Sequence, residues 1–151
     1  MESRGIRNNN PLNIRKSADK WQGQSNYLTP PGKGGDGGES EFCQFYSMEY
    51  GWRAAFMILC RTYYKKYGLK TIRAIISRWA PPKENNTAAY IRHVSDYTGI
   101  GPDKVLASPQ ECPTDWLLIG YAMAVMENGK AFPAVPMLKG WEMAVDNNVN
   151  N

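Results

Sequence analysis

Apolar residues recur at helical spacing through most of the chain after residue 46. In the first such stretch they repeat at i, i+3, i+4, i+7 and i+11, which is typical of one face of an α-helix. Ser47 is a favourable N-cap, Glu49 lies in the first turn, and Gly68 is a favourable stop. The pattern predicts a long helix between Ser47 and Gly68 whose buried face carries Trp52, Ala55, Phe56, Leu59 and Tyr63.

Two shorter helices are predicted next. One begins at Thr71 and ends before the pair Pro81-Pro82, because proline interrupts helical hydrogen bonding. The other begins at Asn86-Thr87 and ends at Gly99. Their predicted inward residues are Ile72, Ile75, Ile76 and Trp79 in the first, and Tyr90, Ile91, Val94 and Tyr97 in the second.

The last two predicted helices differ in character. Thr114 is the expected cap of a helix over residues 116–127, which Gly129 ends. This helix is apolar nearly all round, so we expect it to be the buried centre of the fold. Pro136 is the expected start of a final amphipathic helix that carries Leu138, Trp141, Ala144 and Val145.

The first 46 residues lack this helical pattern. They contain an Asn-rich turn at residues 8–11 and a Gly-rich stretch at 30–38, which predicts a flexible loop. Residues 41–46 are expected to return as a short strand of a small hairpin. We therefore predict a mainly α (α+β) fold with a single domain over residues 1–146. Within these bounds, residues 30–40 form the flexible loop, and residues 147–151 are expected to form a frayed tail.

Composition narrows the possible functions only a little. A net charge of +4 suits an anionic partner, but no Lys/Arg run exceeds two residues, so a nucleic-acid partner is not expected. The three cysteines lack metal-site spacing and His93 is the single histidine, so we expect no metal and no cofactor. The polar start does not resemble a signal peptide, and the apolar run at 116–126 is too short to cross a bilayer. A soluble protein without a membrane partner is expected.

Two glutamates are candidate catalytic residues. Glu127 ends the apolar central helix, where apolar walls and the negative end of the helix dipole would disfavour the charged carboxyl, as a general acid requires. Glu49 lies at a helix start, where the dipole favours the carboxylate, as a base, nucleophile or charge stabiliser requires. The alternative for each is an ordinary glutamate at a helix end. Sequence does not show whether the two meet as a glycosidase pair.

The N-terminal region carries candidate sugar-binding groups. Asn9, Asn10, Asn13 and Arg15 supply amide and guanidinium donors that suit hydroxyl and N-acetyl groups, and Trp21 could stack on a sugar ring. The alternative for the asparagines is turn chemistry, since Asn tolerates left-handed backbone. Trp79 could also stack on a sugar, but its Ile-rich helix face favours a core position.

Four motifs resemble sequences of a family of phage and prophage virion proteins, some of them suspected of degrading peptidoglycan. The motifs are residues 4–15 together with 21–23, residues 42–54, residues 78–91, and residues 127–129. The resemblance spans most of the chain. It implies a virion-associated protein, or one delivered to the bacterial cell wall, with peptidoglycan and other virion proteins as partners. Tyr90, within the third motif, is a further candidate for substrate binding.

A more distant resemblance connects the chain to cell-wall glucosaminidases of the lysozyme superfamily. In that family a helix ends in a catalytic Glu, followed downstream by an NN-L-x-I-[KR] segment, a W-x-G and an F-x-x-Y-x-S stretch. Residues 9–15, 21–23 and 42–47 are similar to the last three parts, whereas the similar glutamate helix, residues 121–129, follows them. This order implies a circularly permuted lysozyme-like domain with Glu127 as general acid, which is physically possible where chain termini lie close together.

Three hypotheses follow. The first is a glycosidase or lytic transglycosylase that binds and cuts peptidoglycan glycan strands. The second is a non-catalytic virion or wall-binding module on the same fold, because a fold does not fix a function. The third, based on mild basicity and aromatic content alone, is a nucleic-acid-associated protein.

Overall fold

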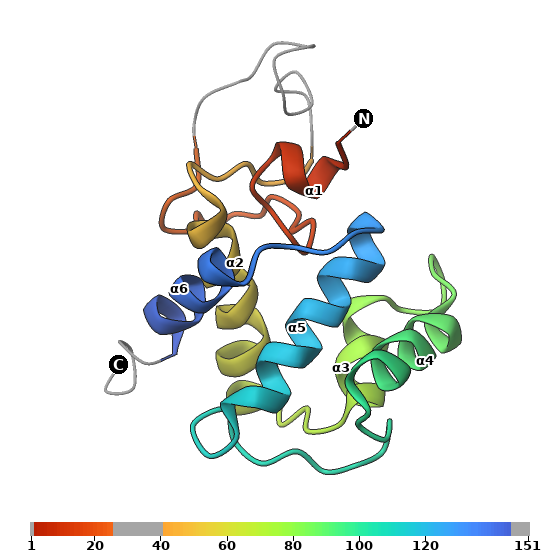
Figure 1. Ribbon diagram of the computed structural model, residues 1–151. Coiled ribbons are helices and arrows are strands. Elements are labelled where there is room, and N and C mark those ends of the chain that lie inside the picture. Colours follow the sequence, from red (N-terminus) through yellow and green to blue (C-terminus); the bar gives the residue numbers. More distant parts are fainter. Residues whose placement is uncertain (1, 26–40, 146–151) are drawn as a thin grey trace.

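The computed structural model describes residues 2–25 and 41–145 (Figure 1). The predicted Gly-rich loop at 30–40 and the predicted tail at 147–151 lie outside these residues. We call residues 2–25 and 41–47 the N-terminal segment, and residues 48–145 the helical region.

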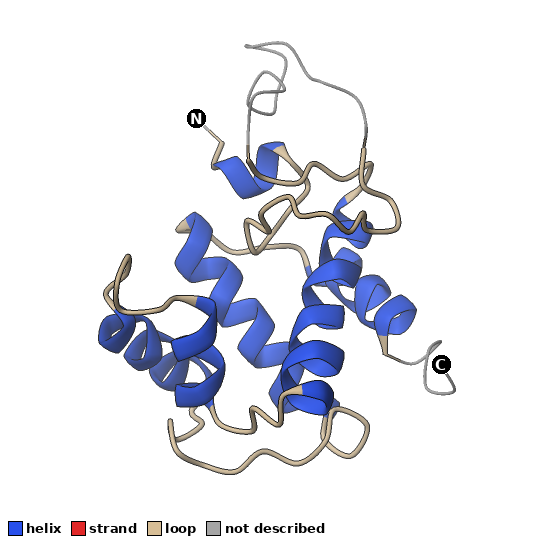
Figure 2. Cartoon of the chain, turned by 180° about the vertical axis from the view of Figure 1, so that it is seen from behind, coloured by secondary structure: helices blue, strands red, loops and turns tan. Residues whose placement is uncertain are grey.

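Helices dominate the described residues, and Figure 2 shows no strand among them. The predicted mainly helical fold is confirmed. The elements are α1 (Arg4–Arg7), α2 (Met48–Phe56), η1 (Met57–Lys66), α3 (Ile72–Trp79), α4 (Thr87–Thr98), α5 (Pro113–Asn128) and α6 (Ala134–Ala144). The single helix predicted between Ser47 and Gly68 is present as α2 and its π-helical continuation η1.

Several predicted helix ends are confirmed by their cap geometry. The side chains of Thr71 and Asn86 each accept a backbone N–H three residues onward at 3.1 Å. Gly99 and Gly129 follow α4 and α5 with φ angles of 75° and 73°, the left-handed conformation that glycine adopts without strain. These local rules therefore set the lengths of α3, α4 and α5.

Two predicted helix starts are wrong, by three residues for α5 and by two for α6. Thr114 does not cap α5; the helix already begins at Pro113, with Cys112 as N-cap. Likewise α6 begins at Ala134, so Pro136 lies within its first turn. Proline is tolerated throughout a first turn because its missing N–H would have no partner within the helix there.

The core forms around α5, as predicted from its apolar circumference. Its buried residues are Trp116, Ile119, Gly120, Ala122, Met123 and Ala124. Beside it, α6 crosses α2 so closely that a Cβ on Gly140 would lie 2.4 Å from the Cβ of Trp52. The Trp52 ring stacks on Phe56 at 5.6 Å, and Trp141 meets Phe56 edge to face at 5.0 Å. One predicted inward residue, Tyr97, is instead 47% exposed.

The N-terminal segment contains less regular structure than predicted. Residues 41–46 form no strand. In place of the predicted hairpin there are two isolated antiparallel bridges, Arg15 to Phe42 and Gln24 to Phe45. Helix α1 was not predicted from the pattern, because four residues are too few to show a helical period. The segment lies across the C-terminal end of α5 (Figure 1).

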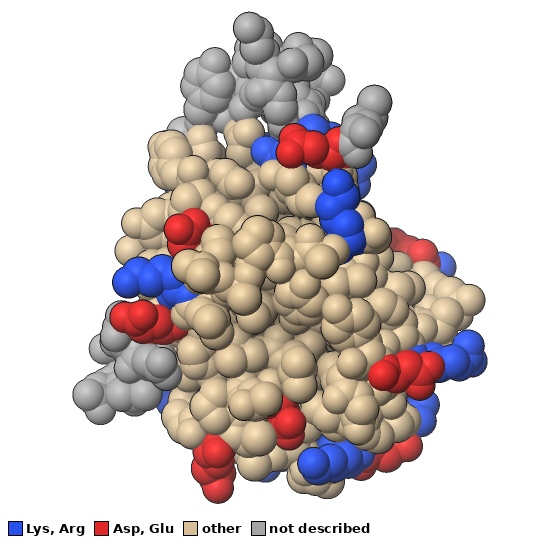
Figure 3. Space-filling view, viewed as in Figure 1, with Lys and Arg blue, Asp and Glu red and all other residues tan. Residues whose placement is uncertain are grey.

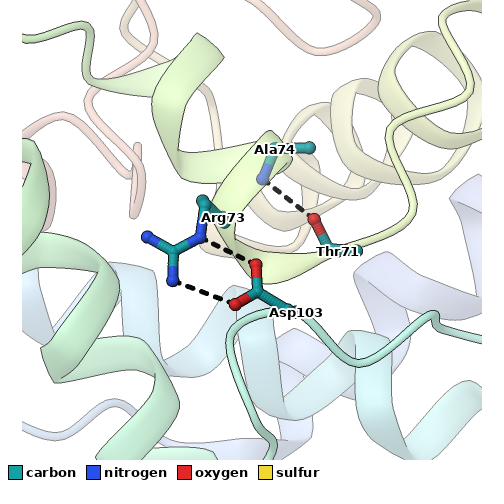
Figure 4. A network of polar contacts seen from close by, with 4 residues as sticks. All are labelled: Thr71, Arg73, Ala74 and Asp103. Carbon is teal, nitrogen blue, oxygen red and sulfur yellow. Dashed lines mark hydrogen bonds and ion pairs between the residues drawn. The ribbon is translucent and has the colours of Figure 1, made fainter.

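The connection between α4 and α5 is tied to the start of α3 (Figure 4). Asp103 accepts two hydrogen bonds from the Arg73 guanidinium, at 2.7 and 3.1 Å, and the Pro102 carbonyl accepts the Arg73 backbone N–H at 3.0 Å. This exposed ion pair lies beside the N-cap of α3, away from the N-terminal segment.

Charged side chains lie mainly around the edge of the face in Figure 3, and the middle of that face, over α5, carries none among the described residues. None of the helices described is both long and apolar enough to cross a membrane. Within residues 2–25 and 41–145, no three His, Cys, Asp or Glu side chains gather as a metal site would require.

Candidate active-site cleft

A cleft of about 440 Å³ lies where the N-terminal segment meets the helical region. The N-terminal segment contributes Arg4, Leu12, Asn13, Ile14, Arg15 and Phe42. The helical region contributes Tyr63, Trp79, Ala80, Pro81, Glu84, Asn85 and Glu127. Both parts of the chain are therefore needed to form it.

The Glu127 carboxylate receives hydrogen bonds from both parts. Asn13 donates from Nδ2 to Oε1 at 3.3 Å, Trp79 donates from Nε1 to Oε2 at 3.4 Å, and the Tyr90 hydroxyl donates to Oε2 at 2.9 Å. The sequence predicts apolar walls around this carboxyl, but three polar donors lie there. They hold both carboxylate oxygens in place at the cleft.

The end of α5 is fixed to the N-terminal segment by the residue after Glu127. Asn128 donates from Nδ2 to the Pro11 carbonyl at 2.8 Å, and its Oδ1 accepts the Ser3 hydroxyl at 2.6 Å. Asn13 itself has a φ of 52°, a left-handed conformation that Asn adopts more easily than most residues. With the backbone in this conformation, the Asn13 side-chain amide lies against the Glu127 carboxylate.

Tyr90 remains a hydrogen-bond donor in this arrangement. Burial and the neighbouring Glu127 carboxylate raise the pKa of its hydroxyl, so the proton stays on the oxygen at neutral pH. Trp79, which the sequence favours as a core residue, is only half-buried and lines the cleft. Its indole N–H needs a polar partner, and Glu127 provides it.

A second carboxylate, Glu84, also lines the cleft. It lies in the connection between α3 and α4, next to Asn85, whose amide donates to the Pro81 carbonyl at 3.1 Å. Glu84 is exposed, whereas Glu127 is half-buried and held by three donors. The two acids therefore occupy different environments in the same cleft.

Comparison with known proteins gives one clear relationship. Protein P5 of Pseudoalteromonas phage PM2 is 40% identical to the chain over 130 residues, which cover 84% of this chain and 72% of P5. The chain belongs to the P5 family. No protein-family model matches the sequence. The relationship to phage proteins expected from the four motifs is thus confirmed.

Four of the predicted site residues come together in this P5-family protein. Asn13, Arg15 and Glu127 line the cleft, and Tyr90 reaches Glu127 from α4. Glu49 is not among the cleft-lining residues; its backbone carbonyl lies against Gly140, where α2 and α6 cross. The structure therefore does not place the two predicted acids in one cleft.

The remaining predicted residues have other contacts. Asn10 is fully buried and uses its amide on the carbonyls of Ile14 and Cys43, at 3.0 and 2.9 Å. Asn9 donates to the Phe45 carbonyl at 3.1 Å. Both amides therefore bind backbone groups within the N-terminal segment and do not face the cleft. The left-handed backbone considered as the alternative is present at Asn9, with a φ of 52°. Trp21 packs partly buried against the core and does not line the cleft.

Some cleft residues were not singled out from the sequence, namely Arg4, Phe42, Tyr63, Glu84 and Asn85. Most of them lie within the motifs that carry the phage-family resemblance, and that membership is the signal that could have identified them. The hydrophobic pattern alone gave no physical reason to distinguish them from neighbouring loop residues.

Proposed function

We propose that the cleft binds a peptidoglycan glycan strand and that Glu127 is the general acid that cleaves one of its glycosidic bonds. The observation that carries this proposal is the Glu127 carboxyl group, held by donors from three separate segments and facing the cleft. The donors fix the position of this carboxyl group at the cleft, and correct placement is the first requirement for proton transfer to a leaving-group oxygen.

The donors around Glu127 suit the state of the site after Glu127 has lost its proton. When a protonated Glu127 gives its proton to the glycosidic oxygen, a carboxylate is left in the site. Hydrogen bonds from Asn13, Trp79 and Tyr90 stabilise that carboxylate, because bonds to an ionised acceptor are stronger than bonds to a neutral one. Charge that develops during the reaction thus meets groups that are already oriented.

The other cleft residues suit a sugar ligand. Trp79 contributes an aromatic ring, and Asn13 and Asn85 contribute amide groups. Glu84 is the candidate for a base that activates water. Without such a base, the acetamido group of the substrate would complete the reaction, as in a lytic transglycosylase.

The closeness of Asn13 and Glu127, which are 114 residues apart in sequence, supports our hypothesis of a circularly permuted lysozyme-like domain. In that arrangement the NN-L-x-I-[KR]-like segment lies against the end of the glutamate helix, as the distant family resemblance implies. Action on the cell wall implies in turn that the protein is carried by a virion or otherwise delivered there.

The test is cleavage of purified sacculi by the wild type and by Glu127→Gln. We expect the wild type to clear the suspension and the variant to be slower by roughly 10²–10⁴-fold, the usual contribution of an acid–base group. Glu142→Gln is the matched control, since Glu142 is an exposed α6 residue within 3.8 Å of Lys139. Circular dichroism would show whether both variants fold.

The products assign the chemistry. New reducing ends indicate hydrolysis, in which case Glu84→Gln is expected to be inactive as well, whereas anhydro-sugar ends indicate transglycosylation. Wild-type protein that binds sacculi without releasing sugar ends would exclude the enzyme and support a non-catalytic wall-binding module. No binding and no cleavage would reject the proposal altogether.

A further inference from the structure

Two arginines share one aromatic ring at the cleft. The guanidinium carbons of Arg4 and Arg15 lie 4.2 and 4.8 Å from the centre of the Phe42 ring. All three side chains line the same cleft as Glu127. We call them the Arg4–Phe42–Arg15 cluster. It places positive charge on the wall that the N-terminal segment forms.

Arg15 already binds a carboxylate in this position. Its guanidinium is paired with Glu41, and both side chains are largely exposed, by 60% and 73%. Exposed ion pairs of this kind contribute little to stability, so the exchange of Glu41 for a carboxylate on a ligand costs little. The planar guanidinium fork also matches the geometry of a carboxylate.

The two sides of the cleft differ in charge. Arg4 and Arg15 come from the N-terminal segment, whereas the acids Glu84 and Glu127 come from the helical region. A neutral sugar polymer carries no charged group that would respond to this difference in charge. A polymer with acidic side groups along one edge does, because those groups are attracted to the arginine side.

We infer that the Arg4–Phe42–Arg15 cluster binds the carboxylates that peptidoglycan carries beside its glycan chain. The ligand class is therefore an acidic amino-sugar polymer, not a neutral one such as chitin. This inference rests on the proposed function and adds a specificity determinant to it. The carboxylate has two possible sources, the lactyl group of the sugar and the peptide attached to that group.

Calorimetric titration of the full chain with three disaccharides tests the inference and separates the sources. The ligands are a peptidoglycan disaccharide with its attached peptide, the same disaccharide with a free lactyl carboxylate, and neutral diacetylchitobiose. We expect at least one acidic ligand to bind about tenfold more tightly than the neutral one, a difference typical of a charge-assisted hydrogen bond. Attachment of the peptide converts the lactyl carboxylate into a neutral amide, so tighter binding of the disaccharide with a free lactyl carboxylate assigns the lactyl group. Tighter binding of the peptide-bearing disaccharide assigns the carboxylates of the peptide.

Variants show whether the cluster causes the preference. Arg15→Gln should reduce binding of the acidic ligands to the level of diacetylchitobiose, and Arg4→Gln should act in the same direction. Arg15→Lys, which keeps the charge and loses the fork, should restore part of the preference. Arg92→Gln removes an equal charge from an exposed position that lines a different pocket, so it should have no effect.

The failure of this inference differs from the failure of the proposed function. Equal binding of all three ligands by the wild type, with sacculi still cleaved, would overturn the inference alone. A preference for acidic ligands that survives in the Arg4→Gln, Arg15→Gln double variant would also overturn it. No binding of any ligand and no cleavage of sacculi would overturn both.

Discussion

The N-terminal segment and the helical region are stabilised in different ways. In the helical region, apolar helix faces pack around α5, and nearly all the buried residues are apolar, Thr87 being a polar exception. In the N-terminal segment, the buried Asn8 and Asn10 lie beside Leu12 and Ile14, and side-chain amides bridge backbone groups. The first arrangement relies on burial of apolar surface, which tolerates small shifts. The second relies on hydrogen bonds, which need a specific geometry.

The largest expected effect on stability is in the helical region. Trp52→Ala removes a fully buried ring that stacks on Phe56 and meets Phe132 edge to face at 5.8 Å. We expect a loss of about 3–5 kcal/mol in the free energy of unfolding, because a large cavity remains. Urea unfolding followed by circular dichroism measures it. A loss below about 1 kcal/mol, the typical effect of an average substitution, would contradict this description of the core.

The next effect is in the N-terminal segment and is chemically selective. Asn10→Asp keeps the side-chain shape but replaces the Nδ2 donor with an oxygen, which then faces the carbonyls of Ile14 and Cys43. We expect a loss of roughly 2–3 kcal/mol, since buried acceptors lose their donor. Hydrogen exchange should rise in the N-terminal segment and not in α5.

The same substitution in the helical region serves as the control. Asn86 is the N-cap of α4, where only its side-chain oxygen is used. Asp caps helices about as well as Asn, so Asn86→Asp should change stability by less than about 0.5 kcal/mol. Equal losses of unfolding free energy in Asn10→Asp and Asn86→Asp would contradict the view that the N-terminal segment depends on specific side-chain hydrogen bonds more than the helical region does.

A third prediction concerns the contact between the two regions. A Cβ on Gly51 would lie 1.9 Å from the Asn9 carbonyl oxygen, so Gly51→Ala forces the N-terminal segment away from α2. We expect a loss of about 1–3 kcal/mol, as for other overpacked sites, together with weaker ligand binding in the cleft. Thermal unfolding and titration measure the two effects. Gly101→Ala, where a Cβ would meet nothing within 4 Å, should leave both unchanged.

The smallest effect is expected at the exposed pair of Figure 4. The hydrogen bond and charge of Arg73 hold the pKa of Asp103 below its usual value. A lowered pKa in the folded state means that the pair stabilises the fold above the usual Asp pKa and loses this effect as pH falls through the lowered pKa. Asp103→Asn should therefore be slightly less stable at neutral pH and indistinguishable from the wild type in strong acid. A difference that persists in acid would show that the charge is not its cause.

The sequence could predict the helical region because its determinants are local. Apolar spacing placed Trp52, Phe56 and Leu59 inside, and Thr71 and Gly99 marked helix ends. The predicted starts at Thr114 and Pro136 are wrong because proline is compatible with several positions of a first turn. A proline near a helix start therefore does not show which residue is the first of the helix.

The N-terminal segment and the cleft could be predicted only in part, because their determinants are distant in sequence. Asn9, Asn10 and Asn13 are chemically identical, yet the first donates to the Phe45 carbonyl, the second is fully buried, and the third reaches Glu127. Which asparagine faces the cleft depends on residue 127, not on its neighbours. For the same reason Trp79 was expected in the core, since its partner lies 48 residues away.

The hydrogen bond between Asn13 and Glu127 has a consequence for the timing of synthesis. Asn13 leaves the ribosome 114 residues before Glu127, which at usual elongation rates is on the order of ten seconds. By residue 85 the nascent chain contains every cleft-lining residue except Glu127. A chain terminated between residues 92 and 126 would contain the first three motifs and still lack Glu127. Any activity of the cleft thus requires translation beyond residue 127.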